Sequence, residues 1–101
     1  MAWQVKWTFA AWNDLENIVD FIAKDSNFYA ASLARETYTA ARSLQTFAER
    51  GRLVPEFHQN DIRELFIQKY RLIYQITEKT VNILAVIHGA RDIKLGFRKK
   101  K

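Results

Sequence analysis

The sequence predicts an α+β domain in which a helical hairpin packs on an antiparallel β-sheet, in the order β-α-α-β-β-β. Two observations predict it. Apolar residues recur with a helical period in the first half of the chain, and they alternate as in strands at the N-terminus and in the second half. The chain has 101 residues, 49% of them hydrophobic, which suits one packed domain. We place that domain at 1–95, followed by a basic C-terminal tail at 96–101.

The first strand and the first helix follow from a change of period. Trp3, Val5 and Trp7 alternate with polar residues, which indicates a strand with one apolar face. From Ala11 the apolar residues follow the 3.6-residue period of a helix. The predicted apolar stripe of this helix is Leu15, Ile18, Val19 and Ile22.

A second helix is expected after the break KDSN at residues 24–27. Three residues of this break could cap the helix: Asp25, Ser26 and Asn27. The predicted seam with the first helix consists of Leu33, Thr37, Ala40, Leu44 and Phe47. Gly51 stands where a glycine C-cap is expected, and Pro55 prevents the helix from resuming.

The second half of the chain predicts three strands. They are the segments DIRELFI (61–67), YRLIYQI (70–76) and VNILAVI (81–87). The last two are joined by the short loop TEKT (77–80), so we expect them to form a hairpin.

One face of this sheet should pack on the helices, and we expect the other face to remain open. Because successive side chains of a strand point to opposite faces, the open face carries polar side chains between apolar ones. Such a surface is typical of docking sites. The residues expected there are Arg71, Gln75, Asn82 and His88, mixed with Ile73, Leu84 and Val86.

The distribution of charge suggests an acidic partner or a phosphate backbone facing the C-terminal half of the chain. Residues 51–101 carry a net charge of +6 and residues 1–50 a net charge of −1. The absence of cysteine excludes disulfides and thiolate chemistry, and the spacing of His58 and His88 does not suggest a zinc site. We therefore expect no metal and no cofactor. No stretch has the length of a membrane span or the layout of a signal peptide, so we expect a cytoplasmic protein without membrane contact.

Four short segments carry a family resemblance. GRLVPE (51–56), IREL (62–65), YRLIYQI (70–76) and VIHGARD (86–92), in this order after two helices, resemble the RelE/ParE superfamily of bacterial toxins. The resemblance extends from Trp7 to Asp92 and is closest to the ParE branch, often described as plasmid-stabilisation proteins. It implies the fold predicted above and a hetero-oligomer with a cognate antitoxin, whose acidic segment wraps the toxin.

The resemblance leaves the target open between two branches. ParE-like members resemble inhibitors of DNA gyrase without a settled catalytic centre, whereas RelE-like members enter the ribosomal A site and cut mRNA. We predict a ParE-like toxin that arrests growth by binding gyrase, hence an inhibitor rather than an enzyme. The alternatives are a RelE-like mRNA endonuclease and a non-toxic, basic nucleic-acid-binding module. The sequence lacks the usual signatures of the last class.

Ribonuclease chemistry would rest on Arg63, His88 and Arg91, because cations stabilise a scissile phosphate and histidine can move a proton. Two absences weigh against it. Phe97 stands where RelE-like enzymes keep a tyrosine, and a phenyl ring cannot transfer a proton. Residues 55–62, PEFHQNDI, also lack the expected lysine pair. For His88, a hydrogen bond to nearby backbone at the end of a strand is the more ordinary role.

The residues we expect to bind the antitoxin or the target are charged, polar or aromatic residues of the second half. They are Arg63, Arg71, Gln75, His88, Arg91, Phe97 and Arg98. Arg91 could equally pair with Asp92. Trp12 is expected in the core, and an exposed Trp12 would instead indicate a contact with an oligomer partner or antitoxin. The exposed side of the helical hairpin is either scaffold or a surface for the target.

Overall fold

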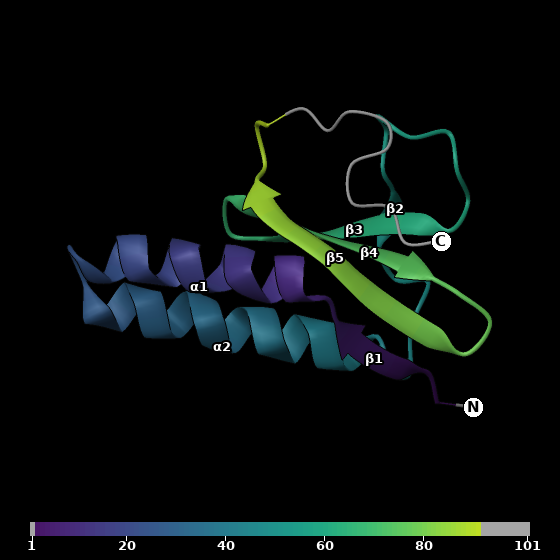
Figure 1. The fold of residues 1–101 in the computed structure, drawn as a ribbon, viewed down its shortest axis with the longest axis horizontal. Coiled ribbons are helices and arrows are strands. Elements are labelled where there is room, and N and C mark those ends of the chain that lie inside the picture. The colour runs from purple at the N-terminus through teal and green to yellow at the C-terminus, as the bar shows by residue number, and fades with distance from the viewer. Residues whose placement is uncertain (1, 92–101) are drawn as a thin grey trace.

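The fold is known from a computed structural model, which describes residues 2–91. Two helices lie side by side on one face of a five-stranded sheet of strand order β1-β5-β4-β3-β2 (Figure 1). This arrangement confirms the predicted α+β class and the helical hairpin. The elements are β1 (Gln4–Trp7), α1 (Phe9–Ala23), α2 (Asn27–Ser43), β2 (Arg52–Leu53), β3 (Ile62–Ile67), β4 (Tyr70–Ile76) and β5 (Thr80–His88).

The sheet is mixed, although we expected it to be antiparallel. The chain leaves β1, passes through both helices and three strands, and returns so that β5 pairs with β1 in parallel. The other three pairs of neighbouring strands are antiparallel. The two-residue strand β2 was not expected, because it is too short to show an alternating pattern.

Both helices begin at a hydroxyl side chain. The Thr8 hydroxyl accepts a hydrogen bond from the Ala11 amide at 3.1 Å and donates to the Ile83 carbonyl at 2.8 Å. Helix α1 therefore begins two residues earlier than its apolar stripe indicated. Ser26, one of the three predicted caps, accepts from the Tyr29 amide at 3.1 Å. Each cap satisfies an amide that the first helical turn leaves without a partner.

Helix α2 ends at Ser43, so two predictions at its C-terminus are wrong. Phe47 was expected in the helix–helix seam, but it lies beyond the helix and is exposed. Gly51 is not a C-cap, because it lies eight residues after Ser43, the last helical residue. Turns fill the interval, and apolar spacing alone could not separate them from a further helical turn.

The main core lies between the helices and the sheet. Leu33 and Leu44 from the hairpin contact the same cluster as Leu72 and Ile83 from the central strands, and all four are completely buried. The first strand contributes the partly buried residues of its apolar face, as predicted: Trp3, Val5 and Trp7.

The opposite face of the sheet is covered, which overturns our expectation of an open face. Val54 and Phe57, from the segment after β2, form a second buried cluster with Ile62, Ile73, Leu84, Ala85 and Ile87. Polar residues of this face are buried as well: Arg71 is 3% exposed, Gln75 5% and Asn82 2%. The Gln75 amide donates to Asp61 at 2.7 Å. Regular alternation reveals which residues share a face but not what lies over that face.

A β-bulge in β5 changes which residues share a face. Ile73 pairs with Ala85 while the next residue, Tyr74, pairs with Ile83, so Leu84 is an extra residue in the ladder. Beyond it the alternation is inverted. Val86 and His88 were expected on the face away from the helices, but they pair with Leu72 and Tyr70 on the helix side.

Tyr74 anchors the turn segment after α2 from inside the core. Its hydroxyl donates to the Ala48 carbonyl at 2.8 Å and accepts from the Gly51 amide at 3.0 Å. Burial raises the pKa of this phenol above its ordinary value of 10.0. The folded state thus holds the phenol proton more tightly than the unfolded chain does. This difference in pKa stabilises the folded state. The stabilisation is fully present below pH 10.0 and is lost as the pH rises through the higher pKa of the folded state.

Tyr74→Phe should therefore change stability in two ways. At neutral pH the unfolding free energy should fall by about 1.5 kcal/mol, because the Gly51 amide and Ala48 carbonyl lose a buried partner. Above pH 10.0, the further decline with pH should be shallower than in the unmodified protein. Urea unfolding across this range measures both effects, with Tyr29→Phe as an exposed control. Equal alkaline slopes for all three proteins would contradict the prediction.

Candidate functional site: a charged cleft on the covered face

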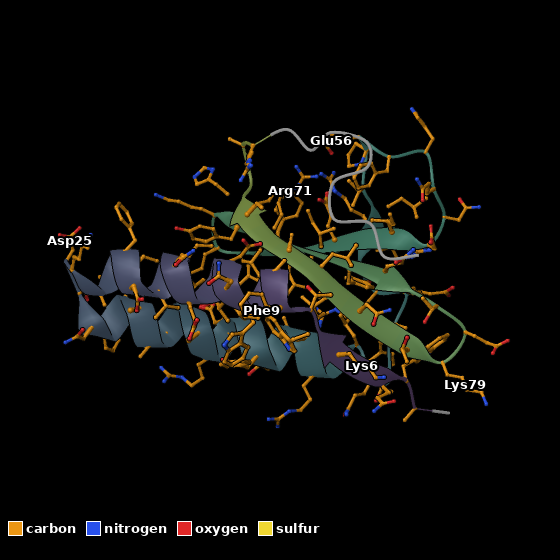
Figure 2. All side chains as sticks on the ribbon, viewed as in Figure 1. Lys6, Phe9, Asp25, Glu56, Arg71 and Lys79 are labelled. Atoms are coloured by element: carbon orange, nitrogen blue, oxygen red, sulfur yellow. The ribbon has the colours of Figure 1, made fainter. Side chains whose placement is uncertain are left out.

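The four segments that carried the family resemblance meet at one place on the face opposite the helices. A cleft of about 390 Å³ is lined by Arg52, Pro55, Glu56, Arg71, Gly89 and Arg91. IREL contributes Glu64, which is hydrogen-bonded to Arg71. Residues that lie far apart in the sequence therefore form one ionic cluster. Figure 2 shows Arg71 and Glu56 close together, away from the helices.

Arg71 is the centre of this cluster. Its guanidinium binds Glu56 through two hydrogen bonds, of 2.8 and 2.9 Å, and donates to the Arg91 carbonyl at 3.0 Å. Its Nε donates to Glu64 at 2.5 Å. The hydrogen bonds from Glu56 and then Glu64 outweigh the effect of burial, so they raise the pKa of Arg71 above its ordinary range. Arg71 remains charged, and both carboxylates neutralise it.

Glu64 lies between two arginines. It is 1% exposed, and its second oxygen accepts from Nε of Arg52 at 2.6 Å. Arg52 itself is more than half exposed and stacks over the ring of Phe66, with 4.9 Å between the guanidinium carbon and the ring centroid. A buried carboxylate needs such partners, because removing its charge from water is costly.

A small basic and aromatic surface remains at the rim of the cleft. We call Arg52, Phe66 and Arg91 the basic patch, because all three are exposed and the two arginines line the cleft. Gly89 brings the turn after β5 close to β3 and β4, since a Cβ there would lie 3.0 Å from the Lys69 carbonyl and 3.7 Å from Phe66. The basic patch is much smaller than the open face expected from the sequence.

The three residues considered for ribonuclease chemistry do not share this cleft. Arg91 lines it, but Arg63 projects to the helix side and donates to the Gly51 carbonyl at 2.8 Å. His88 pairs with Tyr70 whereas Arg63 pairs with Tyr74, an offset of about 13 Å along β4 at roughly 3.3 Å per residue.

His88 makes the ordinary contact expected for a strand end. Its Nδ1 accepts a hydrogen bond from the Ala90 amide at 3.2 Å, and its ring packs edge-on against Tyr70. Phe97 and Arg98, also expected at the binding surface, lie outside the described residues. Within residues 2–91, no group of three His, Cys, Asp or Glu residues could hold a metal ion.

Sequence reasoning missed the two glutamates that control the cleft. Each stands in a segment that we quoted for the resemblance, Glu56 in GRLVPE and Glu64 in IREL. A usable signal was present, because Glu64 and Arg71 belong to neighbouring strands of opposite direction and could share a face. The resulting site can bind a partner through its exposed rim, while its buried arginine is already occupied.

Comparisons with known proteins agree with the resemblance. Residues 5–93 match the family described as ParE toxin of type II toxin-antitoxin system, parDE. The curated Toxin RelE2 of Caulobacter vibrioides is 37% identical over 89 residues, which are 87% of this chain and 97% of that protein. A solved structure titled "Chromosomal ParDE TA system from P. aeruginosa" is similar in fold, with a TM-score of 0.70 at 21% identity. The structural match covers 86% of this chain and 96% of the solved chain. None of the helices in residues 2–91 is long and apolar enough to cross a membrane.

Proposed function

Because the chain belongs to the ParE toxin family of type II toxin–antitoxin systems, we propose that it arrests growth by binding DNA gyrase, without breaking a bond. In this proposal a cognate antitoxin silences it by covering the basic patch. The gyrase target and inhibition by binding are the two parts that we propose. Both agree with the inhibitor predicted from the sequence.

The neutralised state of Arg71 is the observation that supports inhibition by binding. RNA cleavage needs a free cation at the scissile phosphate and groups that transfer protons. Here the buried arginine of the cleft is bound by Glu56 and Glu64, and His88 lies on the other face of the sheet. Among residues 2–91, the lining of the cleft therefore offers charge for docking and no paired acid and base.

The basic patch supports the antitoxin part of the proposal. Arg52 and Arg91 are exposed at the cleft, and Arg52 stacks on the exposed ring of Phe66. This combination of charge and apolar area suits an acidic segment with apolar residues. Arg71 and Gln75 were also expected to contact the antitoxin. Both are buried, so we now expect Arg71 to support the patch from beneath through the Arg91 carbonyl, whereas Gln75 is bonded to Asp61 farther along β4.

A RelE-like mRNA endonuclease remains the second candidate. It is favoured by the 37% identity to a protein named Toxin RelE2 and by the exposed Arg91 in the cleft. If this candidate holds, Arg91 would contact the phosphate, and another exposed group would have to move the proton.

One paired assay separates the two candidates. Purified protein is added to gyrase acting on relaxed plasmid, and to a translation reaction whose mRNA is mapped for new 5′ ends. We expect loss of supercoiling with intact mRNA, and recovery of supercoiling when a cognate antitoxin is added. Codon-spaced cuts that disappear in Arg91→Ala would establish the endonuclease instead. Inactivity in both reactions, without growth arrest on expression, would leave a non-toxic binding module.

A further inference from the structure

A second surface of opposite character lies on the helical hairpin, away from the charged cleft. A groove of about 260 Å³ runs along the outer seam between α1 and α2. Its base is apolar, with Leu15 almost completely buried and the small residue Ala34 on the facing helix. We call it the hairpin groove. Its lining residues are Trp12, Leu15, Glu16, Val19, Asp20, Ala34 and Tyr38.

Aromatic rings form one wall of the hairpin groove. Trp12 was expected in the core and Tyr38 was not considered, and both are about 40% exposed. Each contacts Trp7, with ring centroids 6.0 and 5.8 Å away, and they lie 5.9 Å from each other. These contacts among Trp7, Trp12 and Tyr38 hold the two exposed rings in place. A ligand can therefore bind the ring faces with little loss of side-chain entropy.

Two carboxylates continue the α1 side of the groove beyond Trp12. Glu16 and Asp20 are both exposed and stand four residues apart on α1, where like charges destabilise a helix. Neither takes part in a hydrogen bond or an ion pair within residues 2–91. Burial raises the pKa of the Tyr38 phenol, and the negative charge of Glu16 raises it further. A cation in the groove would relieve the repulsion between the carboxylates.

From this arrangement we propose that the hairpin groove binds a basic segment of a protein partner, with a lysine or arginine that contacts both the aromatic wall and the two carboxylates beside it. Aromatic faces and carboxylates both attract such cations, and the long side-chain stem fits an apolar base. Phe9 is 85% exposed at the start of α1 (Figure 2). It lies one helical turn before Trp12 and so extends the surface for a neighbouring apolar residue.

The negative charge of the hairpin groove indicates that its partner differs from the antitoxin. An acidic segment is attracted by the basic patch and repelled by the rim of Glu16 and Asp20. The two surfaces can therefore bind different partners, and the inference does not depend on whether the toxin inhibits gyrase or cuts mRNA.

The test uses the whole ¹⁵N-labelled protein and two matched peptides, acetyl-LRALRA-amide and acetyl-LEALEA-amide. NMR titration with the arginine peptide should shift the indole N–H of Trp12 and the amides of Glu16 and Ala34. The glutamate peptide should leave these signals in place. Glu16→Gln combined with Asp20→Asn should weaken binding of the arginine peptide by about three- to fivefold.

A control variant keeps this result interpretable. Glu49→Gln combined with Glu78→Gln removes the same charge from two exposed positions outside the groove, and it should bind the arginine peptide as the unmodified protein does. Equal weakening in both double variants, or equal response to both peptides, would overturn the proposal. So would shifts of the groove signals with protein concentration alone, because a second copy would then be the occupant.

Discussion

Replacing Arg71 by methionine should lower the unfolding free energy by about 3–5 kcal/mol, the largest loss we expect from a single substitution outside the apolar core. The substitution leaves Glu64 buried with only the half-exposed Arg52 as partner. It also releases Glu56 and the Arg91 carbonyl, which Arg71 holds from beneath. Urea unfolding at neutral pH measures the change.

Two further variants separate the buried charge from ordinary packing. Arg52→Met removes the exposed partner of Glu64 and should cost below about 1 kcal/mol, because Arg71 still neutralises the carboxylate. Adding Glu64→Leu to Arg71→Met should recover much of the loss, since no uncompensated charge remains in the interior. Equal losses for Arg52→Met and Arg71→Met would show that Arg71 is not the centre of the cluster.

Gly51→Ala should have the second largest effect, a loss of about 3 kcal/mol. A Cβ at Gly51 would lie 2.6 Å from the Glu64 carbonyl oxygen and 2.6 Å from the Tyr74 hydroxyl. Backbone atoms cannot turn away as a flexible side chain can, so β2 must move from β3. The shift would also weaken the hydrogen bond from the Gly51 amide to Tyr74.

A double-mutant cycle tests the steric origin of this effect. In a Tyr74→Phe background the hydroxyl contact is absent, so Gly51→Ala should cost about 1 kcal/mol less than in the unmodified protein. Gly89→Ala serves as the comparison, because its nearest contact is 3.0 Å and the next is 3.7 Å, and it should be milder. Additive losses at Gly51 and Tyr74 would exclude a steric conflict between them.

The periodicity of the sequence was sufficient for the fold class and for most elements. The helical stripe around Leu15 and the alternation in YRLIYQI are local patterns, and each element was found close to its predicted position. The errors lie where no local pattern operates. The C-terminal end of α2 and the two-residue β2 depend on contacts with β3 and Tyr74, which come later in the chain.

The candidate site was predicted only in part. Arg71 and Arg91 were recognised from their segments, and both belong to the charged cleft. The surroundings of these arginines were not recognised, because the carboxylates that bind Arg71 are distant in sequence. Glu56 lies fifteen residues from Arg71, and Glu64 lies seven residues from it. The basic patch is therefore centred on Arg52 and Phe66 rather than on Arg71 and Gln75. Trp12, expected in the core, is instead exposed on the hairpin.

By itself, the sequence determined the helical hairpin and the three-stranded meander of β3 to β5, because each follows from residues close together in the chain. Four short segments in a fixed order indicated the toxin family. Only the tertiary structure decided which surfaces are free. The bulge at Leu84 inverts one strand end, and Val54 and Phe57 cover the face that alternation left open. Burial and charge pairing depend on what packs above a residue, and that neighbour comes from elsewhere in the chain.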